Sequence, residues 1–189
     1  MVNNITIDIL EPFLESPDEK LHLSDIARKI KAPHPTARLW LNQLEKKGVL
    51  KKEYKGRLTL YSLKKDLPCL IDYLVMAEKK KLIRKCEESL ILKELANYLQ
   101  QSLPENTKAL IFGSAAQNPA KAEDIDLLIR GECDEKDIMR VSKKLGREIH
   151  LISTKSLSQV TSALKQEIIG KHLIIKGSED ILRWIIWQQ

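Results

Sequence analysis

The spacing of apolar residues changes along the chain and separates it into three parts. Up to about residue 47, apolar residues recur at helical spacing in three stretches, which end near Ser16-Pro17, within KAPHPT and at Gly48. VLKKEY and RLTLYSL then alternate apolar with polar residues around Lys55-Gly56, which predicts a β-hairpin. The first part is therefore predicted to run helix, helix, helix, hairpin.

Local signals place two of these helices more closely. Ser24 is predicted to cap the second helix, and Pro35 to lie in the first turn of the third. The apolar side of the third helix is predicted to consist of Leu39, Leu41 and Leu44, and the pattern leaves open whether Trp40 belongs to it.

The middle part, residues 64–102, contains no glycine and a single proline, Pro68. Its leucines and isoleucines recur at helical spacing, which predicts one or two helices. The highly charged stretch EKKKLIRKCEE marks an exposed segment or a bend. The pattern leaves open whether these helices pair between subunits or pack on the C-terminal part.

The third part mixes short strands with helices. TKALIF is predicted as a strand, followed at once by Gly113-Ser114, a short helix that ends at Asn118-Pro119, and the strand DIDLLI. Further strands are predicted at REIHLIS and HLIIK, and further helices at 134–146 with Asp134 as its cap, at 157–165, and after a cap at Ser178. The fold class that follows is α+β, with a mixed β-sheet and flanking helices.

Composition narrows the class of protein. The 189 residues are 43% hydrophobic and 31% charged, as in folded globular proteins. No apolar run is long enough to span a bilayer, and the N-terminus lacks the layout of a signal peptide. The three cysteines are widely spaced and form no Cys-x-x-Cys pair, which predicts reduced thiols and argues against zinc. We expect a cytoplasmic protein with no membrane partner.

Charge is unevenly distributed along the first part. Residues 20–65 contain 13 Lys or Arg against three acids, whereas residues 1–19 contain five acids and no Lys or Arg. Such a basic segment fits a polyanionic partner, but it also fits a lysine-rich surface that only contacts water. Charge alone leaves both interpretations open.

The order of elements between about Ile5 and Leu63 resembles the winged helix-turn-helix family. The phrase LSDIARKIKAPHPTARLWLNQLEKKGVLKKE is similar to the central part of that family. The resemblance implies that the helix beginning near Pro35 enters the major groove of DNA and that the hairpin tip reaches phosphates. It also leaves room for a winged helix that binds protein or only supports an enzyme. The candidate DNA contacts are His34, Thr36, Arg38, Asn42 and Gln43 on the helix, and Lys55 and Arg57 at the hairpin tip.

The strand DIDLLI carries the residues with the clearest chemical implication. Side chains alternate along a strand, so Asp124 and Asp126 project from one face. Two carboxylates so placed repel each other unless a cation lies between them, and Mg²⁺ prefers carboxylate and phosphate oxygens. Gly113 allows the backbone to approach a phosphate closely, and Ser114 offers donors to it. A turn followed by an ordinary acidic strand is the alternative.

These motifs, FGSAAQ and EDIDLLI, resemble the nucleotidyltransferases of the DNA polymerase β-like superfamily, in particular its small, minimal members. The resemblance covers roughly residues 106–186. It implies that Gly113 and Ser114 hold nucleotide phosphates and that Asp124 and Asp126 bind Mg²⁺. The implied reaction is in-line transfer of a nucleotidyl group from an NTP such as ATP, with two metal ions.

The sequence departs from this family in two places. Gln117-Asn118 stands where members often carry Arg-Gly, so a basic phosphate contact is missing. The third carboxylate of the family lies on a later strand, and on REIHLIS its position is His150. Glu148 lies two residues earlier on the same strand face, so either Glu148 or His150 could take over part of the role, or the site could be inactive.

Together these features predict a winged helix DNA-binding domain at 1–66, a helical linker at 67–104 and a nucleotidyltransferase domain at 105–189. One hypothesis is a Mg²⁺-dependent nucleotidyltransferase coupled to a DNA-binding winged helix. The other is a transcriptional regulator whose nucleotidyltransferase-like domain only binds nucleotide or dimerises. The implied partners are DNA and a nucleotide; a homodimer and a toxin-like protein partner remain open.

Overall fold

The structure, a computed structural model, has an α+β fold and describes residues 7–187. The start of the first predicted helix, at Ile5, lies outside the described residues. Contacts between residues group the chain into two compact units, 1–78 and 79–189. The boundary between the units falls inside helix α5 (Leu70–Glu88).

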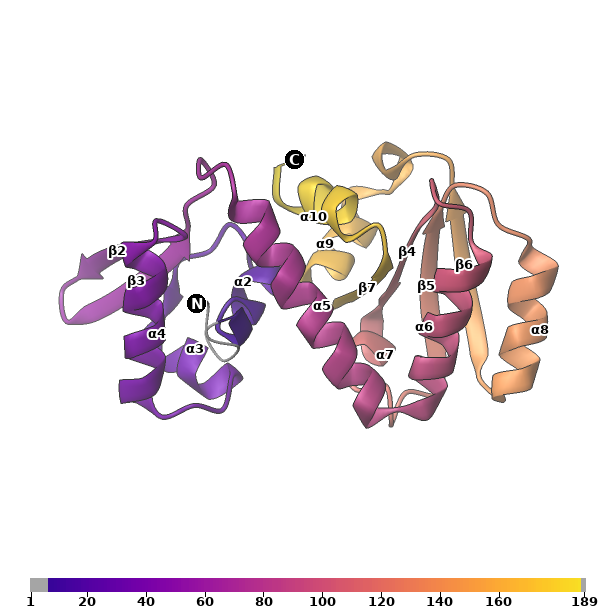
Figure 1. The fold of residues 1–189 in the computed structure, drawn as a ribbon, viewed down its shortest axis with the longest axis horizontal. Helices are drawn as coiled ribbons and strands as arrows, with labels where there is room; N and C mark the ends of the chain where they lie inside the picture. Colours follow the sequence, from indigo (N-terminus) through magenta and orange to yellow (C-terminus); the bar gives the residue numbers. More distant parts are fainter. Residues whose placement is uncertain (1–6, 188–189) are drawn as a thin grey trace. The chain divides into compact units, whose positions relative to one another are not determined.

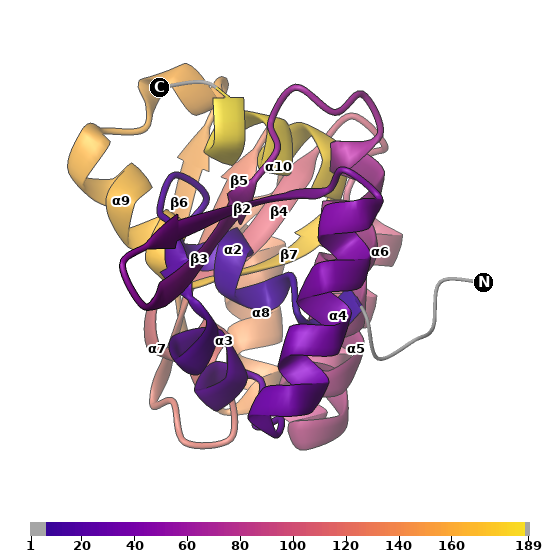
Figure 2. The same ribbon diagram turned by 90° about the vertical axis from the view of Figure 1, so that its left-hand side faces the viewer.

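The N-terminal unit combines short helices with a small antiparallel sheet (Figures 1 and 2). Strands β2 and β3 form the predicted hairpin, and β1 pairs with β3, so the sheet order is β1-β3-β2. The predicted order of helices and hairpin is therefore confirmed. Before α5 the elements are α2 (Glu11–Glu15), β1 (Leu21–His22), α3 (Leu23–Lys29), α4 (His34–Lys46), β2 (Leu50–Lys55) and β3 (Leu58–Leu63).

The ends and faces of α3 and α4 differ in two details from the sequence prediction. The side chain of His22 caps α3 by accepting the backbone N–H of Ser24, so Ser24 lies inside the helix and is not its cap. Helix α4 has proline in its first turn, as predicted, and buries Ala37, Leu41 and Leu44. Leu39 is 57% exposed, because it lies on the opposite side of α4 from these three residues.

The C-terminal unit is built on a four-stranded mixed sheet with the order β6-β5-β4-β7. Strand β4 is antiparallel to both β5 and β7, whereas β5 and β6 are parallel. After α5 the elements are α6 (Leu90–Ser102), β4 (Lys108–Phe112), α7 (Gly113–Gln117), β5 (Asp124–Arg130), α8 (Glu135–Leu145), β6 (Glu148–Thr154), a 3₁₀ turn (Leu157–Gln159), α9 (Ser162–Gly170), β7 (His172–Lys176) and α10 (Ser178–Trp187).

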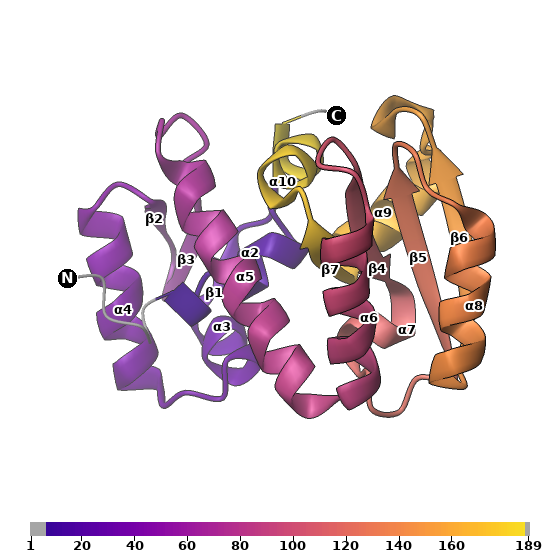
Figure 3. The ribbon, with the colours of Figure 1, turned by 45° about the vertical axis from the view of Figure 1, so that its right-hand side comes forward.

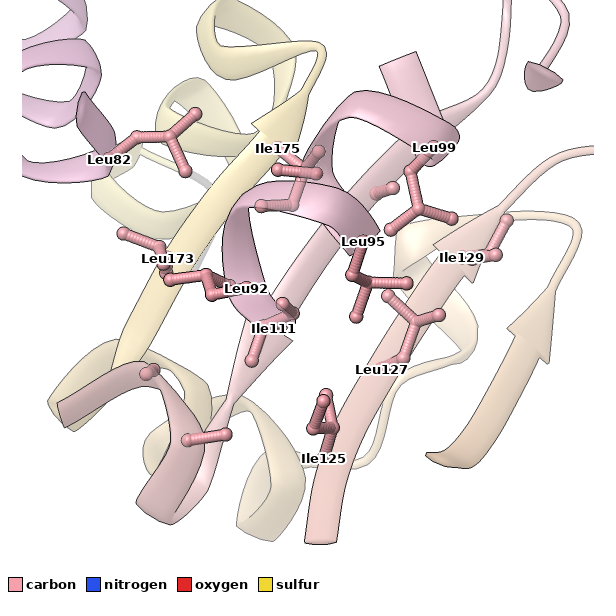
Figure 4. Packing of buried hydrophobic residues seen from close by; sticks show 14 of the residues in the cluster. Leu82, Leu92, Leu95, Leu99, Ile111, Ile125, Leu127, Ile129, Leu173 and Ile175 are labelled. Atoms are coloured by element: carbon pink, nitrogen blue, oxygen red, sulfur yellow. The ribbon is translucent and has the colours of Figure 1, made fainter. Parts of the chain in front are cut away.

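Helices cover both faces of this sheet. Figure 3 shows α6 and α8 in front of the strands, and α6 packs against β7 and α8. In Figure 4, Leu92, Leu95 and Leu99 of α6 point toward the strands that carry Ile111, Leu127 and Ile175. On the other face α10 packs against β4 and β7. Alternation along the strands thus gives each face its own buried layer.

Three predicted elements of residues 64–187 differ in the structure. The charged stretch EKKKLIRKCEE is continuous helix within α5, and the break falls at Ser89, whose side chain caps α6. The predicted helix at 157–165 is divided, because Ser156 caps the 3₁₀ turn and Thr161 separately caps α9. Ser178 is the first residue of α10, and its buried hydroxyl has no hydrogen-bond partner among the described residues.

No helix within residues 7–187 combines the length and the apolar character needed to cross a membrane. The three cysteines are free thiols.

Candidate active site and candidate DNA-binding surface

Strand β5 places Asp124 and Asp126 together on one face of the sheet. Ile125 and Leu127 alternate with them and are buried in the core beneath α6, whereas both aspartates are partly exposed. The predicted strand and the predicted alternation are therefore confirmed, and both aspartates project away from the α6 face.

The parallel pairing of β5 with β6 brings a second pair of polar residues to the same face. Asp124 lies opposite Glu148 in the ladder, and Asp126 lies opposite His150. The four residues predicted to be catalytic therefore form one cluster in the structure.

The imidazole of His150 lies at the centre of this cluster. Its Nδ1 is 3.4 Å from Asp126 Oδ1 and 3.7 Å from Asp124 Oδ2, and its Nε2 is 3.3 Å from Glu148 Oε1. Hydrogen bonding to Asp126, with a smaller contribution from Glu148, raises the pKa of His150 above its ordinary value of 6.5. A protonated His150 therefore neutralises part of the negative charge of the two aspartates.

Gly113 lies directly against the carboxylate of Asp126. Its φ is +70°, a backbone conformation that residues with a side chain rarely adopt. A Cβ built on Gly113 would be 2.7 Å from Asp126 Oδ2 and 3.9 Å from Glu167 Oε1. Its backbone N–H donates a hydrogen bond to the carbonyl oxygen of Lys171 at 3.1 Å. Glycine is therefore favoured here by the backbone conformation, and a Cβ would also force the Asp126 carboxylate to move.

Ser114 opens onto a small pocket between α7 and the start of β5. The pocket has a volume of about 330 Å³, and its lining includes Ser114, Lys121 and Asp124. The predicted phosphate-binding Ser114 and the predicted metal ligand Asp124 thus share one cavity with a lysine. Sequence reasoning missed Lys121, although a basic residue between the Gly-Ser pair and the two aspartates was visible in the sequence.

A second lysine, Lys85, contacts the end of α7 at Gln117. This is the position where the family that the sequence resembles often carries arginine. Lys85 Nζ donates to the carbonyl oxygen of Gln117 at 2.7 Å and also pairs with Glu88 at 2.8 Å. The ammonium group of Lys85 is thereby occupied by contacts within the protein. Among the described residues, Lys121 is the basic side chain that lines the pocket next to Ser114.

The donor set of the cluster fits Mg²⁺. Asp124 and Asp126 offer hard carboxylate oxygens on one strand face, next to a glycine where a Cβ would touch one of those oxygens. Within residues 7–187, there is no group of three or more His, Cys, Asp or Glu side chains that could hold a metal ion. Asp124 and Asp126 therefore offer two candidate ligands and not a complete metal site.

The predicted DNA contacts lie on α4 and at the hairpin tip of the N-terminal unit. His34, Arg38 and Gln43 are exposed, Thr36 is half-buried, and Lys55 and Arg57, on either side of the turn at Gly56, are exposed. Neither Lys55 nor Arg57 forms an ion pair within residues 7–187, so both charges are available at the surface.

Asn42 differs from the other candidate contacts because it faces the hairpin. Its half-buried amide oxygen accepts hydrogen bonds from Lys52 Nζ at 2.9 Å and from the Tyr61 hydroxyl at 3.2 Å. The Lys52 ammonium also lies 5.4 Å from the ring centre of Tyr54 and 5.9 Å from that of Tyr61. Asn42 therefore joins α4 to the hairpin, and this contact was not visible in the sequence.

Part of the positive charge of the N-terminal unit is neutralised internally. Lys20 pairs with Glu53 and Lys29 with Glu15, each at 2.5 Å, Arg28 pairs with Asp25 at 2.7 Å, and Lys65 pairs with Asp18. The basic residues at the hairpin tip, Lys55 and Arg57, are not among these pairs, so they contribute to the positive charge that remains on the unit.

Comparisons of the chain with protein-family models, with curated proteins and with solved structures found no match.

Proposed function

We propose that this protein is a Mg²⁺-dependent nucleotidyltransferase whose N-terminal unit binds DNA. The observation that carries the proposal is the convergence of Asp124 and Asp126 on one strand face beside Gly113 and beside the pocket of Ser114 and Lys121. Carboxylates, a close backbone approach and a lysine in one place are what an NTP–Mg²⁺ complex requires.

In this proposal the residues of the site divide between the phosphates and the cation. Ser114 and Lys121 bind phosphate oxygens of the NTP in the pocket that they line, and Asp124 and Asp126 hold Mg²⁺. Bound Mg²⁺ supplies positive charge that offsets the charge of the phosphate oxygens. Gly113 keeps the space beside Asp126 open, since any larger residue would contact its carboxylate.

The transfer itself forms one bond and breaks another. An acceptor hydroxyl oxygen bonds to the α-phosphorus, the bond from that phosphorus to the bridging oxygen breaks, and pyrophosphate leaves. The hydroxyl proton passes to a base. Glu148 and His150 are the candidates for this base that lie beside the aspartates on β6.

A second function is favoured by the contacts of His150. Because its ring lies within 4 Å of both Asp124 and Asp126, it competes with a cation for the two carboxylates. The alternative is thus a transcriptional regulator whose C-terminal unit binds a nucleotide or a second copy of itself without catalysing transfer.

ATP labelled at its α-phosphate distinguishes the two functions. We would measure Mg²⁺-dependent ATP binding, and then label transferred to protein or RNA of a cell extract, for the wild type and for Asp126→Asn. Asp66→Asn, in the exposed loop between β3 and α5, is the matched control. A transferase loses label transfer in Asp126→Asn and keeps it in the control.

The other outcomes are equally informative. Mg²⁺-dependent binding of ATP without transfer to any acceptor supports the regulator. If neither Mg²⁺ nor ATP binds to the wild type, the assignment of the C-terminal unit is wrong in both versions.

A further inference from the structure

We propose that Glu167 of α9 supplies the third carboxylate of the cation site, in place of the strand residues Glu148 and His150. This inference rests on the proposed function, because it adds a ligand to the site that Asp124 and Asp126 form there. It assigns a role to a residue that lies about 40 positions beyond the two aspartates.

The position of Glu167 is defined by its distance from Gly113. A Cβ atom built on Gly113 would lie 2.7 Å from Asp126 Oδ2 and 3.9 Å from Glu167 Oε1. The two oxygens can therefore be no more than 6.6 Å apart, the sum of these distances. Two oxygens bound to one Mg²⁺ at about 2.1 Å each lie at most about 4.2 Å apart. The side chain of Glu167 is exposed and has three rotatable bonds, so rotation of the side chain can cover the difference.

The backbone of Glu167 is held in place by hydrogen bonds that lead to Gly113. The N–H of Lys171 donates to the carbonyl oxygen of Glu167 at 3.0 Å, and the carbonyl oxygen of Lys171 accepts the N–H of Gly113 at 3.1 Å. Ile168, the next residue of α9, is fully buried and anchors the helix. The exposed carboxylate can thus rotate about its side-chain bonds, while the backbone that carries it is held beside the Gly-Ser turn.

Glu148 is less well placed, although it lies on the same strand face as the aspartates. Its Oε1 is 3.3 Å from His150 Nε2, while the opposite nitrogen of that ring, Nδ1, faces Asp124 and Asp126. The imidazole therefore lies between Glu148 and the aspartates. Asp126 Oδ1 faces this ring, whereas Asp126 Oδ2 faces Gly113 and the side of Glu167.

Binding of Mn²⁺, a paramagnetic substitute for Mg²⁺, tests the assignment without reference to activity. The full chain would be titrated with Mn²⁺ alone and bound ion measured by electron paramagnetic resonance and calorimetry. The variants are Glu167→Gln, Glu167→Asp, Glu148→Gln and Asp126→Asn. Glu105→Gln, in the exposed loop before β4 and at the opposite end of that strand from Gly113, is the control for loss of one negative charge.

We expect Glu167→Gln to weaken Mn²⁺ affinity by at least about tenfold, which is the smallest effect usual even for residues that only support metal ligands. Glu105→Gln should bind Mn²⁺ like the wild type, because residue 105 lies beyond the end of β4 that is opposite Gly113, and Glu148→Gln should lose less affinity than Glu167→Gln. Glu167→Asp keeps the charge but shortens the side chain, so weaker binding in this variant as well indicates a direct ligand. Wild-type affinity in Glu167→Asp would overturn direct ligation.

The remaining outcomes separate this inference from the proposed function. If Asp126→Asn loses Mn²⁺ and Glu167→Gln binds it like the wild type, the role of Glu167 is wrong and the proposed function stands. If the wild type binds no Mn²⁺, or binds it no better than Asp126→Asn, the proposed function fails and the inference fails with it.

Discussion

The Nδ1 atom of His150 lies 3.4 Å from the Oδ1 atom of Asp126, on the neighbouring parallel strand. The contact joins the residue that replaces the expected third carboxylate to one of the two expected metal ligands. Its strength depends on pH, because His150 carries a positive charge only when protonated.

The first prediction concerns the titration of His150. Because hydrogen bonding to Asp126 raises its pKa, we expect a midpoint above 6.5 in an NMR titration of its ring protons. Asp126→Asn should lower the midpoint, since the hydrogen bond to Asp126 is the largest single cause of the raised pKa. A His150→Gln variant assigns the resonance, and an unchanged midpoint in Asp126→Asn would contradict the prediction.

The same shift sets the direction of the pH dependence of stability. The pKa of His150 is higher in the folded chain than in the unfolded chain, where it is near 6.5. Protonation of His150 therefore stabilises the fold, and this stabilisation is complete at pH values below the pKa of the unfolded chain. This contribution is lost as the pH rises through the higher folded value. The wild type should therefore be more stable than His150→Gln at low pH. Their free energies of unfolding should approach each other as the pH rises above the pKa of His150 in the folded chain.

The second prediction concerns the crowded position of Gly113. Gly113→Ala should lower the free energy of unfolding by more than the roughly 1–2 kcal/mol that a left-handed backbone costs a residue with a Cβ. The additional loss arises because the new Cβ would lie 2.7 Å from Asp126 Oδ2. Urea denaturation measures both effects.

Gly146→Ala is the matched control for this change. Gly146 has a φ of +61° and ends α8, but a Cβ there would meet nothing within 4 Å. The control should show the backbone cost alone and leave Mn²⁺ binding intact. Equal losses of stability in both variants would mean that the contact with Asp126 contributes nothing.

Much of this site could be predicted from the sequence because it depends on local rules. Asp124 and Asp126 share a face because side chains alternate in any strand, and the Gly-Ser pair follows β4 directly in the chain. The hairpin around Gly56 follows from the same alternation and from turn chemistry. These features require no knowledge of which elements become neighbours.

Apart from Lys121, which lies between the two motifs in the chain, the contacts that were missed depend on tertiary packing. Asn42 meets Lys52 only after the hairpin folds back on α4, and Glu167 meets Gly113 only after β7 pairs with β4. The orientation of Glu148 toward His150 depends on the rotamers of both side chains. Residue spacing along one strand gives no information about any of these.

The third prediction tests the core between α6 and the sheet. Leu95 is fully buried against the strands, so Leu95→Ala should cost about 2–5 kcal/mol of unfolding free energy. Leu90, on the same helix, is 70% exposed, and Leu90→Ala should change stability by no more than about 0.5 kcal/mol. Fluorescence in a Trp40→Phe background follows the C-terminal unit, because Trp184 and Trp187 both belong to α10. Similar costs for the two variants would show that α6 does not pack as described.

The fourth prediction concerns the hairpin tip as a phosphate-binding element. The exposed charges of Lys55 and Arg57 make no ion pair within residues 7–187, so both can contact DNA phosphates. Reversing both charges, Lys55→Glu with Arg57→Glu, should weaken binding to any DNA duplex. The slope of log affinity against log salt should become shallower by roughly 2, because each lost phosphate contact contributes about 0.9.

A control with the same change of charge separates a local contact from general attraction. Lys143 and Lys144 are exposed on α8 of the C-terminal unit, and reversing both changes the net charge equally. Fluorescence anisotropy of a labelled duplex at several salt concentrations measures affinity and slope for both variants. If the Lys143 and Lys144 variant loses as much affinity as the hairpin variant, the attraction is general and the hairpin tip is not a DNA contact. If the hairpin variant alone loses affinity, the contact lies where the resemblance to winged helices predicts it.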